Sequence, residues 1–489
     1  MKRKTLVIGG GLAGITAAVA LAGAGEDLTL LEAKPRLGGA TMSFDRDGLI
    51  VDTGQHVFLR CCTAYRGLLD RLGMTAHAPL QSRFDVTVLS PGRPARLRRA
   101  KMPAPLHLGS TLARYSVLSH PERIMAARAA LAFRHVDPED PEADQTRLGD
   151  WMAAHGQSEH ARRALWDLFT IATLNVPGDD ASLALAAKVV RTGLLEEAGA
   201  ADIGVPALPL GELHGAAAQR KLESLGASVR MNTKVETIET TGPGQFTVRL
   251  ARSGEVIEAD QVVLAVPHEA AARLIPAGAL PEAVVSDWAG LGAAPIVNVH
   301  VIYDRKVLDP PFAAAVDSPV QWVFDRTRIS GMHARGDDGQ YLAVSLSAAD
   351  AYVDQSVAEL RERFVPALAD VLPAAREARV TGFFVTRERR ATFRQVPGCA
   401  RLRPPAATGL PGLVLAGSWT DTGWPDTMEG AVRSGLNAVQ ALPGHGKRSF
   451  PQGPRQGLPE GGLGGQVSPQ WGFEKGALPP LGDTEEVRS

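Results

Sequence analysis

Three glycines and one acid near the start of the chain have the spacing of a dinucleotide-binding site. Gly9, Gly11 and Gly14 follow a short apolar run, and Glu32 ends the next one. In such an arrangement the first glycine forms a tight turn, the second lets a pyrophosphate approach the backbone, and the third lets a helix pack closely. A carboxylate at the position of Glu32 can accept hydrogen bonds from an unphosphorylated ribose. These residues therefore indicate that the chain binds a dinucleotide.

The elements that must position these residues follow from the apolar runs. Residues 5–8 and 28–31 are predicted strands, and residues 13–24 are a predicted helix. The helix starts at Ala13, so its N-terminal amides point at the phosphates. Strand, glycine turn, helix, strand and acid in this order predict a Rossmann-like unit.

A second group of small residues favours one dinucleotide over another. Arg36, Gly38 and Gly39 come soon after Glu32, and Gly54 ends an Asp-Thr-Gly triplet. A nicotinamide dehydrogenase has no need of this second glycine pair. In flavoproteins with two dinucleotide-binding domains, an arginine and bare backbone at this point wrap the ribityl-phosphate region of FAD. The sequence therefore favours FAD over NAD.

Two later blocks return to the cofactor domain. Residues 211–225 are a predicted helix that leads into strands and a hairpin, which residues 258–267 close. In this block Val235 either offers backbone groups to the adenine or is an ordinary strand residue. The last block, residues 412–435, predicts a strand and a helix whose N-terminus can stabilise negative charge on a reduced isoalloxazine; an ordinary strand–helix unit is the alternative. Its cofactor-binding candidates are Gly417, Met428 and Glu429.

Two insertions separate the three blocks. The predicted fold class is α/β: a two-dinucleotide-binding-domain (Rossmann-like) FAD fold with an inserted mixed α+β substrate domain. The discontinuous FAD-binding domain comprises residues 1–80, 205–268 and 405–445, the substrate domain comprises residues 81–204 and 269–404, and residues 446–489 form a tail. The tail is rich in glycine and proline and lacks periodicity, so we expect it to be disordered.

Composition limits the remaining classes of function. The formal net charge of −1 gives no general reason to expect nucleic acid as a partner. Three cysteines, of which Cys61 and Cys62 are adjacent, form neither a disulfide framework nor a metal-ligand pattern, so we expect a reducing, cytoplasmic compartment and no metal. The basic start of the chain is not a signal peptide, because Gly9–Gly11 interrupt its apolar run. No stretch approaches the roughly 20 apolar residues of a membrane span.

The catalytic candidates are His56 and Asp167. His56 follows the Asp-Thr-Gly triplet and is expected near the flavin edge, with a structural histidine as the alternative. Residues 165–174 form a predicted helix on which Asp167, Thr170 and Thr173 share one face. That face belongs either to a core helix or to an apolar substrate pocket. The pocket candidates are Trp166, Phe169, Thr170, Trp419 and Trp424, and the further ionisable candidates are Asp179, Asp180, Asp202 and His214.

Residues 93–101 are strongly basic. The positive side chains are Arg93, Arg96, Arg98, Arg99 and Lys101, and apolar residues stand between and beyond them. Such a segment is either the solvated edge of a hairpin or a patch that docks peripherally on anionic lipid at the inner face of a membrane.

With these residues in hand, the chain resembles the flavin amine oxidase and phytoene desaturase superfamily over about residues 4–440. Within it, several segments are similar to the squalene-associated FAD-dependent enzymes, the hydroxysqualene dehydroxylases. These segments are Asp52–Phe58, Leu165–Phe169, Leu174–Pro177, Ala201–Pro206 and Gly423–Pro425. The middle segments are the more specific ones, because the first glycine motif is shared by many flavoproteins.

The resemblance implies reductive removal of the hydroxyl of a C30 isoprenoid alcohol, hydroxysqualene, to give squalene. The hydroxyl leaves as water from an allylic carbon, helped by a general acid, and reduced FAD delivers hydride to the resulting cation. A dry, aromatic pocket protects that cation. The reaction also needs an electron donor for FAD, which the sequence does not identify.

Three alternatives stay open at this point. A carotenoid-type desaturase shares every flavin motif and differs in the direction of hydride transfer. A flavin amine oxidase is compatible with Trp419 and Trp424 as paired aromatic residues, although Cys399 lacks the context of a flavin-attachment site. The third alternative is a non-catalytic FAD-bound carrier of isoprenoids.

Overall fold

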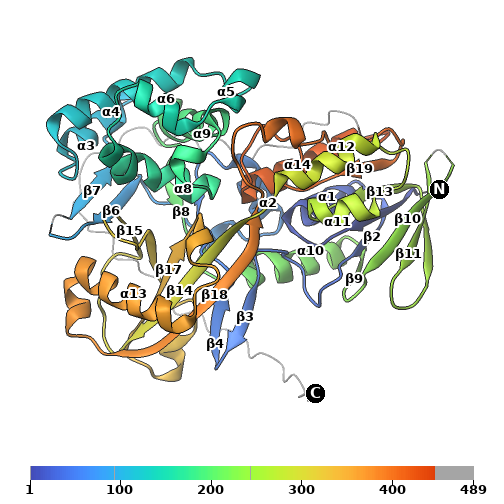
Figure 1. Ribbon diagram of the computed structural model, residues 1–489. Helices are drawn as coiled ribbons and strands as arrows, with labels where there is room; N and C mark the ends of the chain where they lie inside the picture. Colours follow the sequence, from blue (N-terminus) through green and yellow to red (C-terminus); the bar gives the residue numbers. More distant parts are fainter. Residues whose placement is uncertain (1, 93, 243, 446–489) are drawn as a thin grey trace, which may run out of the picture. The chain divides into compact units, whose positions relative to one another are not determined.

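The computed structural model describes residues 2–92, 94–242 and 244–445, and its parallel sheet contains the start of the chain. The strand order is β19-β13-β1-β2-β9 (Figure 1), and every neighbouring pair is parallel. Its strands are β1 (Lys4–Ile8), β2 (Asp27–Leu31), β9 (Ser228–Arg230), β13 (Gln261–Leu264) and β19 (Leu413–Leu415). Residues 5–8 of β1 are all buried, as expected for the central strand of a parallel sheet. The predicted strands at 5–8 and 28–31 are confirmed.

The helices packed with this sheet include the first and the last of the structure. The helices α1 (Leu12–Gly23), α10 (Ala217–Ser224) and α14 (Met428–Ala441) contact its strands. The helix α2 (Thr63–Arg71) contacts α14, and α11 (His268–Leu274) contacts β10 (Val235–Gly242) of the neighbouring sheet. The helices α1 and α14 lie side by side (Figure 1). A Cβ on Gly435 of α14 would lie 2.3 Å from the carbonyl oxygen of Ala13, so the two backbones touch. The predicted helix over 211–225 is confirmed, with a π-helical segment Gly211–Ala216 leading into α10.

The predicted hairpin closure over 258–267 is divided between two sheets. Its first part belongs to an antiparallel sheet of β10 (Val235–Gly242), β11 (Gln245–Leu250) and β12 (Val256–Ala259), and its second part is β13 of the parallel sheet. Asp260 is the single residue between β12 and β13, and its side chain accepts a hydrogen bond from the Lys4 amide at 2.8 Å. The chain passes from one sheet to the other within a single residue. Because this leaves the run of apolar residues almost continuous, the sequence pattern did not reveal the change of sheet.

A seven-stranded mixed sheet contains strands from both insertions. Its order is β18-β14-β17-β16-β15-β6-β7, in which only the β15–β6 pair is parallel. Its strands are β6 (Asp85–Leu89), β7 (Ala95–Arg98), β14 (Ala294–Tyr303), β15 (Phe312–Ala315), β16 (Trp322–Asp325), β17 (Gln340–Leu346) and β18 (Val380–Thr392). Two ribbons complete the strands: β3 (Ser43–Arg46) with β4 (Leu49–Asp52), and β5 (Phe58–Leu59) with β8 (Ile203–Gly204). The two insertions thus build one sheet, while the exact domain boundaries stay a prediction.

Most remaining helices belong to the first insertion, and α3 to α9 gather in one region of Figure 1. They are α3 (Gly109–Arg114), α4 (His120–Ala132), α5 (Pro141–Gln145), α6 (Leu148–Ala154), α7 (Glu159–Ala161), α8 (Asp167–Leu174) and α9 (Leu183–Val190); α12 (Glu282–Asp287) and α13 (Val357–Val371) follow later. The predicted helix over 165–174 is confirmed, since α8 continues a π-helical segment, Arg162–Trp166. It ends at Asn175, whose φ is +52°, and the side-chain Nδ2 of Asn175 donates to the carbonyl oxygen of Ala294 at 3.1 Å.

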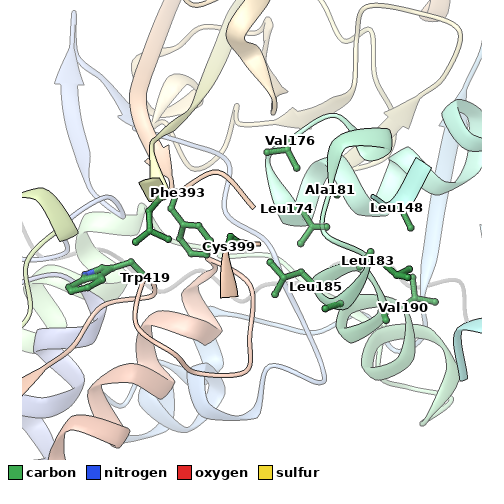
Figure 2. Close-up of a cluster of buried hydrophobic side chains, with 14 of the residues drawn as sticks. Leu148, Leu174, Val176, Ala181, Leu183, Leu185, Val190, Phe393, Cys399 and Trp419 are labelled. Carbon is green, nitrogen blue, oxygen red and sulfur yellow. The ribbon is translucent and has the colours of Figure 1, made fainter. Parts of the chain in front are cut away.

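One apolar core connects this helical region with the last cofactor block. Figure 2 shows Leu148 and Val190 at one end of the cluster and Trp419 at the other, with Leu174 and Phe393 between them. None of the helices in the described part of the chain has the length and hydropathy of a membrane span. The predicted disordered tail at 446–489 lies outside the described residues.

Candidate functional site

The first glycine turn has no room for a side chain at Gly9 or Gly14. Gly9 has a φ of +109°, and a Cβ on it would lie 2.2 Å from the carbonyl oxygen of Ala265. A Cβ on Gly14 would lie 1.9 Å from the carbonyl oxygen of Gly9. No described side chain caps the N-terminus of α1, whose N-cap residue is Gly11. The turn therefore presents bare backbone and a helix N-terminus, the features that hold a pyrophosphate.

A second glycine loop faces the first. The amide of Gly38 donates to the carbonyl oxygen of Gly10 at 2.8 Å, and a Cβ on Gly39 would lie 2.9 Å from the Cα of Gly11. The Glu32 carboxylate accepts from the Gly10 amide at 2.6 Å and from the Lys34 amide at 2.7 Å, which fixes it beside the turn. Each carboxylate oxygen keeps a second lone pair for a ribose hydroxyl. The loops thus fit an FAD, and the exposed Arg36 lies on the second of them.

A cavity of about 400 Å³ leads away from these loops. At the glycine-loop side its lining includes Thr41 and His56, and on the inserted domain it includes Phe84, Phe169 and Phe324. The wall is mostly apolar and aromatic, which suits a hydrophobic substrate with few polar groups.

The structure brings some of the predicted site residues to this cavity and leaves others away from it. The lining contains Gly38, Gly54, His56, Phe169, Trp424, Met428 and Glu429. At the glycine turns stand Gly9, Gly11, Ala13, Gly14, Glu32, Arg36 and Gly39. Outside the lining are Trp166, Asp167, Thr170, Val235, Gly417 and Trp419.

Two of the predicted pocket tryptophans are packed inside the protein. The Trp166 indole donates to the side-chain oxygen of Gln157 at 2.9 Å. The Trp419 indole donates to the carbonyl oxygen of Val266 at 3.0 Å, and its ring centre lies 4.8 Å from that of Trp288. Neither indole lines the cavity, and the polar edge of each is satisfied within the fold.

The face of α8 that lines the cavity is not the predicted polar face. Leu168, Phe169, Ala172 and Thr173 line it, a stripe with the three- and four-residue spacing of one helix face. Thr170 points elsewhere, and its hydroxyl donates to the carbonyl oxygen of Trp166 at 3.1 Å. Of the three polar residues predicted to act together, only Thr173 reaches the cavity.

Asp167 lies against a loop rather than against the cavity. A Cβ on Gly178 would lie 1.9 Å from Oδ1 of Asp167, so backbone covers the carboxyl group. Burial, and secondly the charge of Asp179, raise the pKa of Asp167 to about 6. Because the folded state holds this proton more tightly than the unfolded state, the carboxyl group lowers stability as the pH rises from about 4 through 6.

We therefore expect Asp167→Asn to stabilise the protein at pH 7.5 and not at pH 4. The expected gain in the free energy of unfolding is about 1–3 kcal/mol at the higher pH, discounted for the partial exposure of the side chain. Urea unfolding at both pH values measures it, and an equal effect at both would contradict the assignment.

His56 is the predicted catalytic residue that does lie on the cavity. Its Nδ1 is buried and has no hydrogen-bond partner among the described residues. A Cβ on Gly54 would lie 3.0 Å from the imidazole, so this glycine makes room for the ring. Burial lowers the pKa of His56, so the imidazole is neutral at pH 7. It can hydrogen-bond a polar group of a bound substrate.

The other ionisable candidates serve the fold. Asp202 is buried and pairs with Arg99 at 2.7 Å and with Arg60 at 3.1 Å. His214 is buried and its Nε2 lies 2.8 Å from the hydroxyl of Tyr65. Asp179 pairs with Arg162, and Asp180 pairs with Arg147.

Three arginines of the basic segment are paired with two acids. Arg96 and Arg98 both pair with Asp85, and Arg99 pairs with Asp202. These pairs are those of a hairpin edge, since β6 carries Asp85 and β7 carries the two arginines. Docking on lipid stays a prediction, and Arg93 lies outside the described residues.

The last helix begins at the cavity. Thr427 caps α14 by accepting from the Gly430 amide at 3.2 Å. The Glu429 carboxylate accepts from the Tyr65 amide at 2.8 Å and from Arg433 at 2.8 Å, so it ties α14 to the start of α2. Glu429 thus holds the helix end in place.

Lys188 is a cavity residue that the sequence did not reveal. It stands on α9 and lines the cavity. The signal available was a single charged residue inside the apolar run Leu-Ala-Leu-Ala-Ala-Lys-Val-Val. Within the described residues, no group of three or more His, Cys, Asp or Glu side chains could hold a metal ion.

The parallel sheet, the two glycine loops and the adjoining cavity define an FAD-dependent oxidoreductase, and the predicted FAD-binding α/β fold is confirmed. The model of the family "Flavin containing amine oxidoreductase" matches residues 12–443, and the chain belongs to this family.

Relatives differ in the reactions that their names describe. A hydroxysqualene dehydroxylase of Rhodopseudomonas palustris is 29% identical over 457 residues, covering 90% of this chain and 99% of the relative. A 15-cis-phytoene desaturase of Glycine max is 25% identical over 459 residues, covering 89% of this chain and 79% of the relative. Among solved structures, an oxidoreductase from Methanosarcina mazei has a TM-score of 0.69 at 16% identity, covering 89% of this chain and all of that one. This last likeness concerns the fold alone.

Proposed function

We propose that this chain is a hydroxysqualene dehydroxylase, which replaces the hydroxyl of a C30 isoprenoid alcohol by hydrogen. Two relatives with that name, 27% and 29% identical, are each covered over 99% of their length. The phytoene desaturases are 24–25% identical and are covered over 77–80%. About the same share of this chain is matched in both groups, 89–90%, but the dehydroxylases are themselves covered more completely than the desaturases.

The observation that carries the proposal is a partnerless nitrogen on an apolar cavity. A hydrocarbon such as phytoene offers nothing to Nδ1 of His56, and a buried polar atom without a partner costs about 1–3 kcal/mol. An alcohol supplies the missing hydrogen bond. The cavity is therefore better suited to an isoprenoid alcohol than to an isoprenoid hydrocarbon.

The chain's own residues bind the reactants and exclude water. The glycine loops at Gly9–Gly14 and Gly38–Gly39 hold FAD, which supplies hydride when it is reduced. Phe169, Trp322 and Phe324 line the cavity, where their ring faces favour a cation and keep water from it. His56 orients the hydroxyl by a hydrogen bond.

The test is an anaerobic incubation of the chemically reduced holoprotein with hydroxysqualene. We expect squalene in proportion to the flavin reoxidised. In a parallel incubation, oxidised holoprotein with phytoene should give no desaturated product. Absence of squalene in the first incubation, or desaturation in the second, would overturn the proposal, the latter in favour of the desaturase.

A further inference from the structure

Lys188 places a positive charge on the cavity wall. Within the described residues, Lys188 and His56 are the basic side chains of the lining. The ammonium nitrogen of Lys188 lies 5.4 Å from the ring centre of Trp424, which also lines the cavity. The guanidinium of Arg433 lies 4.6 Å from the same ring. The electron-rich face of the indole attracts the ammonium and limits where it can move.

The acids of the lining are already engaged in the fold. Glu429 is held by the Tyr65 amide, Asp426 accepts from the Phe393 amide at 2.9 Å, and Glu388 accepts from the Arg390 amide at 3.3 Å. No hydrogen bond or ion pair joins Lys188 to another residue in the part of the chain that the structure describes. The half-buried ammonium is therefore ready to pair with an oxygen of a bound molecule.

We propose that Lys188 donates the proton with which the substrate hydroxyl leaves as water. This inference rests on the proposed function. The proton passes from Nζ to the hydroxyl oxygen, and the C–O bond breaks with its electron pair going to the water formed. Lysine becomes neutral and the positive charge moves to the allylic carbon, which then accepts the hydride supplied by the reduced cofactor.

Lys188 is better suited to this step than His56 for two reasons. The imidazole of His56 is neutral at pH 7, because burial lowers its pKa, so it carries no imidazolium proton to give. In addition, the step transfers one positive charge from the ammonium of Lys188 to the allylic carbon. It therefore does not create a new pair of opposite charges. Charge separation would be costly in a cavity of low dielectric constant.

The first experiment measures binding to the oxidised holoprotein, where no turnover occurs. The dissociation constants of hydroxysqualene and squalene are obtained from perturbation of the flavin spectrum. We expect Lys188→Met to lower the preference for the alcohol about 10- to 100-fold, the range of a hydrogen bond to a charged group, and to leave squalene binding unchanged. The matched control is Lys306→Met, which removes an exposed lysine outside the cavity lining and should leave both constants unchanged.

The second experiment separates binding from proton donation. Arginine keeps the charge but does not give up its proton, so Lys188→Arg should keep the preference for the alcohol. Its single-turnover rate with reduced FAD should fall about 10²- to 10⁴-fold, the usual contribution of a placed general acid.

Two outcomes would overturn the inference. The first is an unchanged preference for the alcohol in Lys188→Met; if the reduction potential of FAD is lowered as well, the ammonium lies against the cofactor instead. The second is an undiminished single-turnover rate in Lys188→Arg. Failure of the wild-type protein to form squalene would instead overturn the proposed function, and the binding experiment would still decide whether Lys188 contacts the hydroxyl.

Discussion

Gly14→Ala protein is expected to purify with little or no flavin. A Cβ at this position would lie 1.9 Å from the carbonyl oxygen of Gly9, so α1 must move away from the turn that it supports. Overpacking of this kind costs about 1–3 kcal/mol, which corresponds to roughly 5- to 150-fold weaker FAD binding. Titration of the apoprotein with FAD, followed by flavin fluorescence, measures the change.

The matched control is Gly23→Ala at the other end of the same helix. A Cβ on Gly23 meets no atom within 4 Å. Alanine is the better helix former, so this variant should bind FAD normally and be as stable as the wild-type protein or slightly more stable. Equal FAD affinity in both variants would mean that close packing at the turn does not govern cofactor binding.

Asp52→Ala is expected to lower the free energy of unfolding by about 3–5 kcal/mol, the usual cost of leaving one charge of a buried pair alone. The Asp52 carboxylate pairs with Arg326, and both side chains are at most 8% exposed. It also accepts from the Ser43 hydroxyl at 2.5 Å and from the Leu210 amide at 3.0 Å. Chemical denaturation of the holoprotein measures the loss.

An exposed ion pair provides the comparison. Asp354 pairs with Arg389 at 2.7 Å, but the two side chains are 80% and 60% exposed. Asp354→Ala should therefore change stability by no more than about 1 kcal/mol. If the two substitutions lower the free energy of unfolding equally, the buried Asp52–Arg326 pair contributes no more to stability than an exposed pair does.

The cofactor side of the site could be predicted from the sequence because backbone geometry governs it. Gly9 and Gly14 leave no room for a Cβ, so the residue type reports the local structure directly. The same holds for the strands at 5–8 and 28–31, whose continuous apolar runs match a buried parallel sheet.

The substrate side could not be predicted in the same way because tertiary contacts decide it. The sequence allows Trp419 to line a pocket. In the structure, however, its indole lies in the core and donates a hydrogen bond to the carbonyl oxygen of Val266. Asp167, Thr170 and Thr173 do have helical spacing. The side of α8 that lines the cavity, however, is an adjacent one that carries Leu168, Phe169, Ala172 and Thr173. Lys188 could not be predicted as a cavity residue, because the sequence around α9 does not show that this lysine lies beside Trp424, 236 positions later.

The side-by-side packing of α1 and α14 has a consequence for synthesis in the cell. Strands β1 and β2 leave the ribosome first, yet β19 and α14 are translated about 380 residues afterwards. At about 5–20 residues per second, one side of α1 stays uncovered for roughly 20–75 s, and the edge of β13 waits roughly 7–30 s for β19. Flavin loading is thus expected to be a post-translational event, and chaperones that shield unfinished sheets should raise the yield of yellow protein.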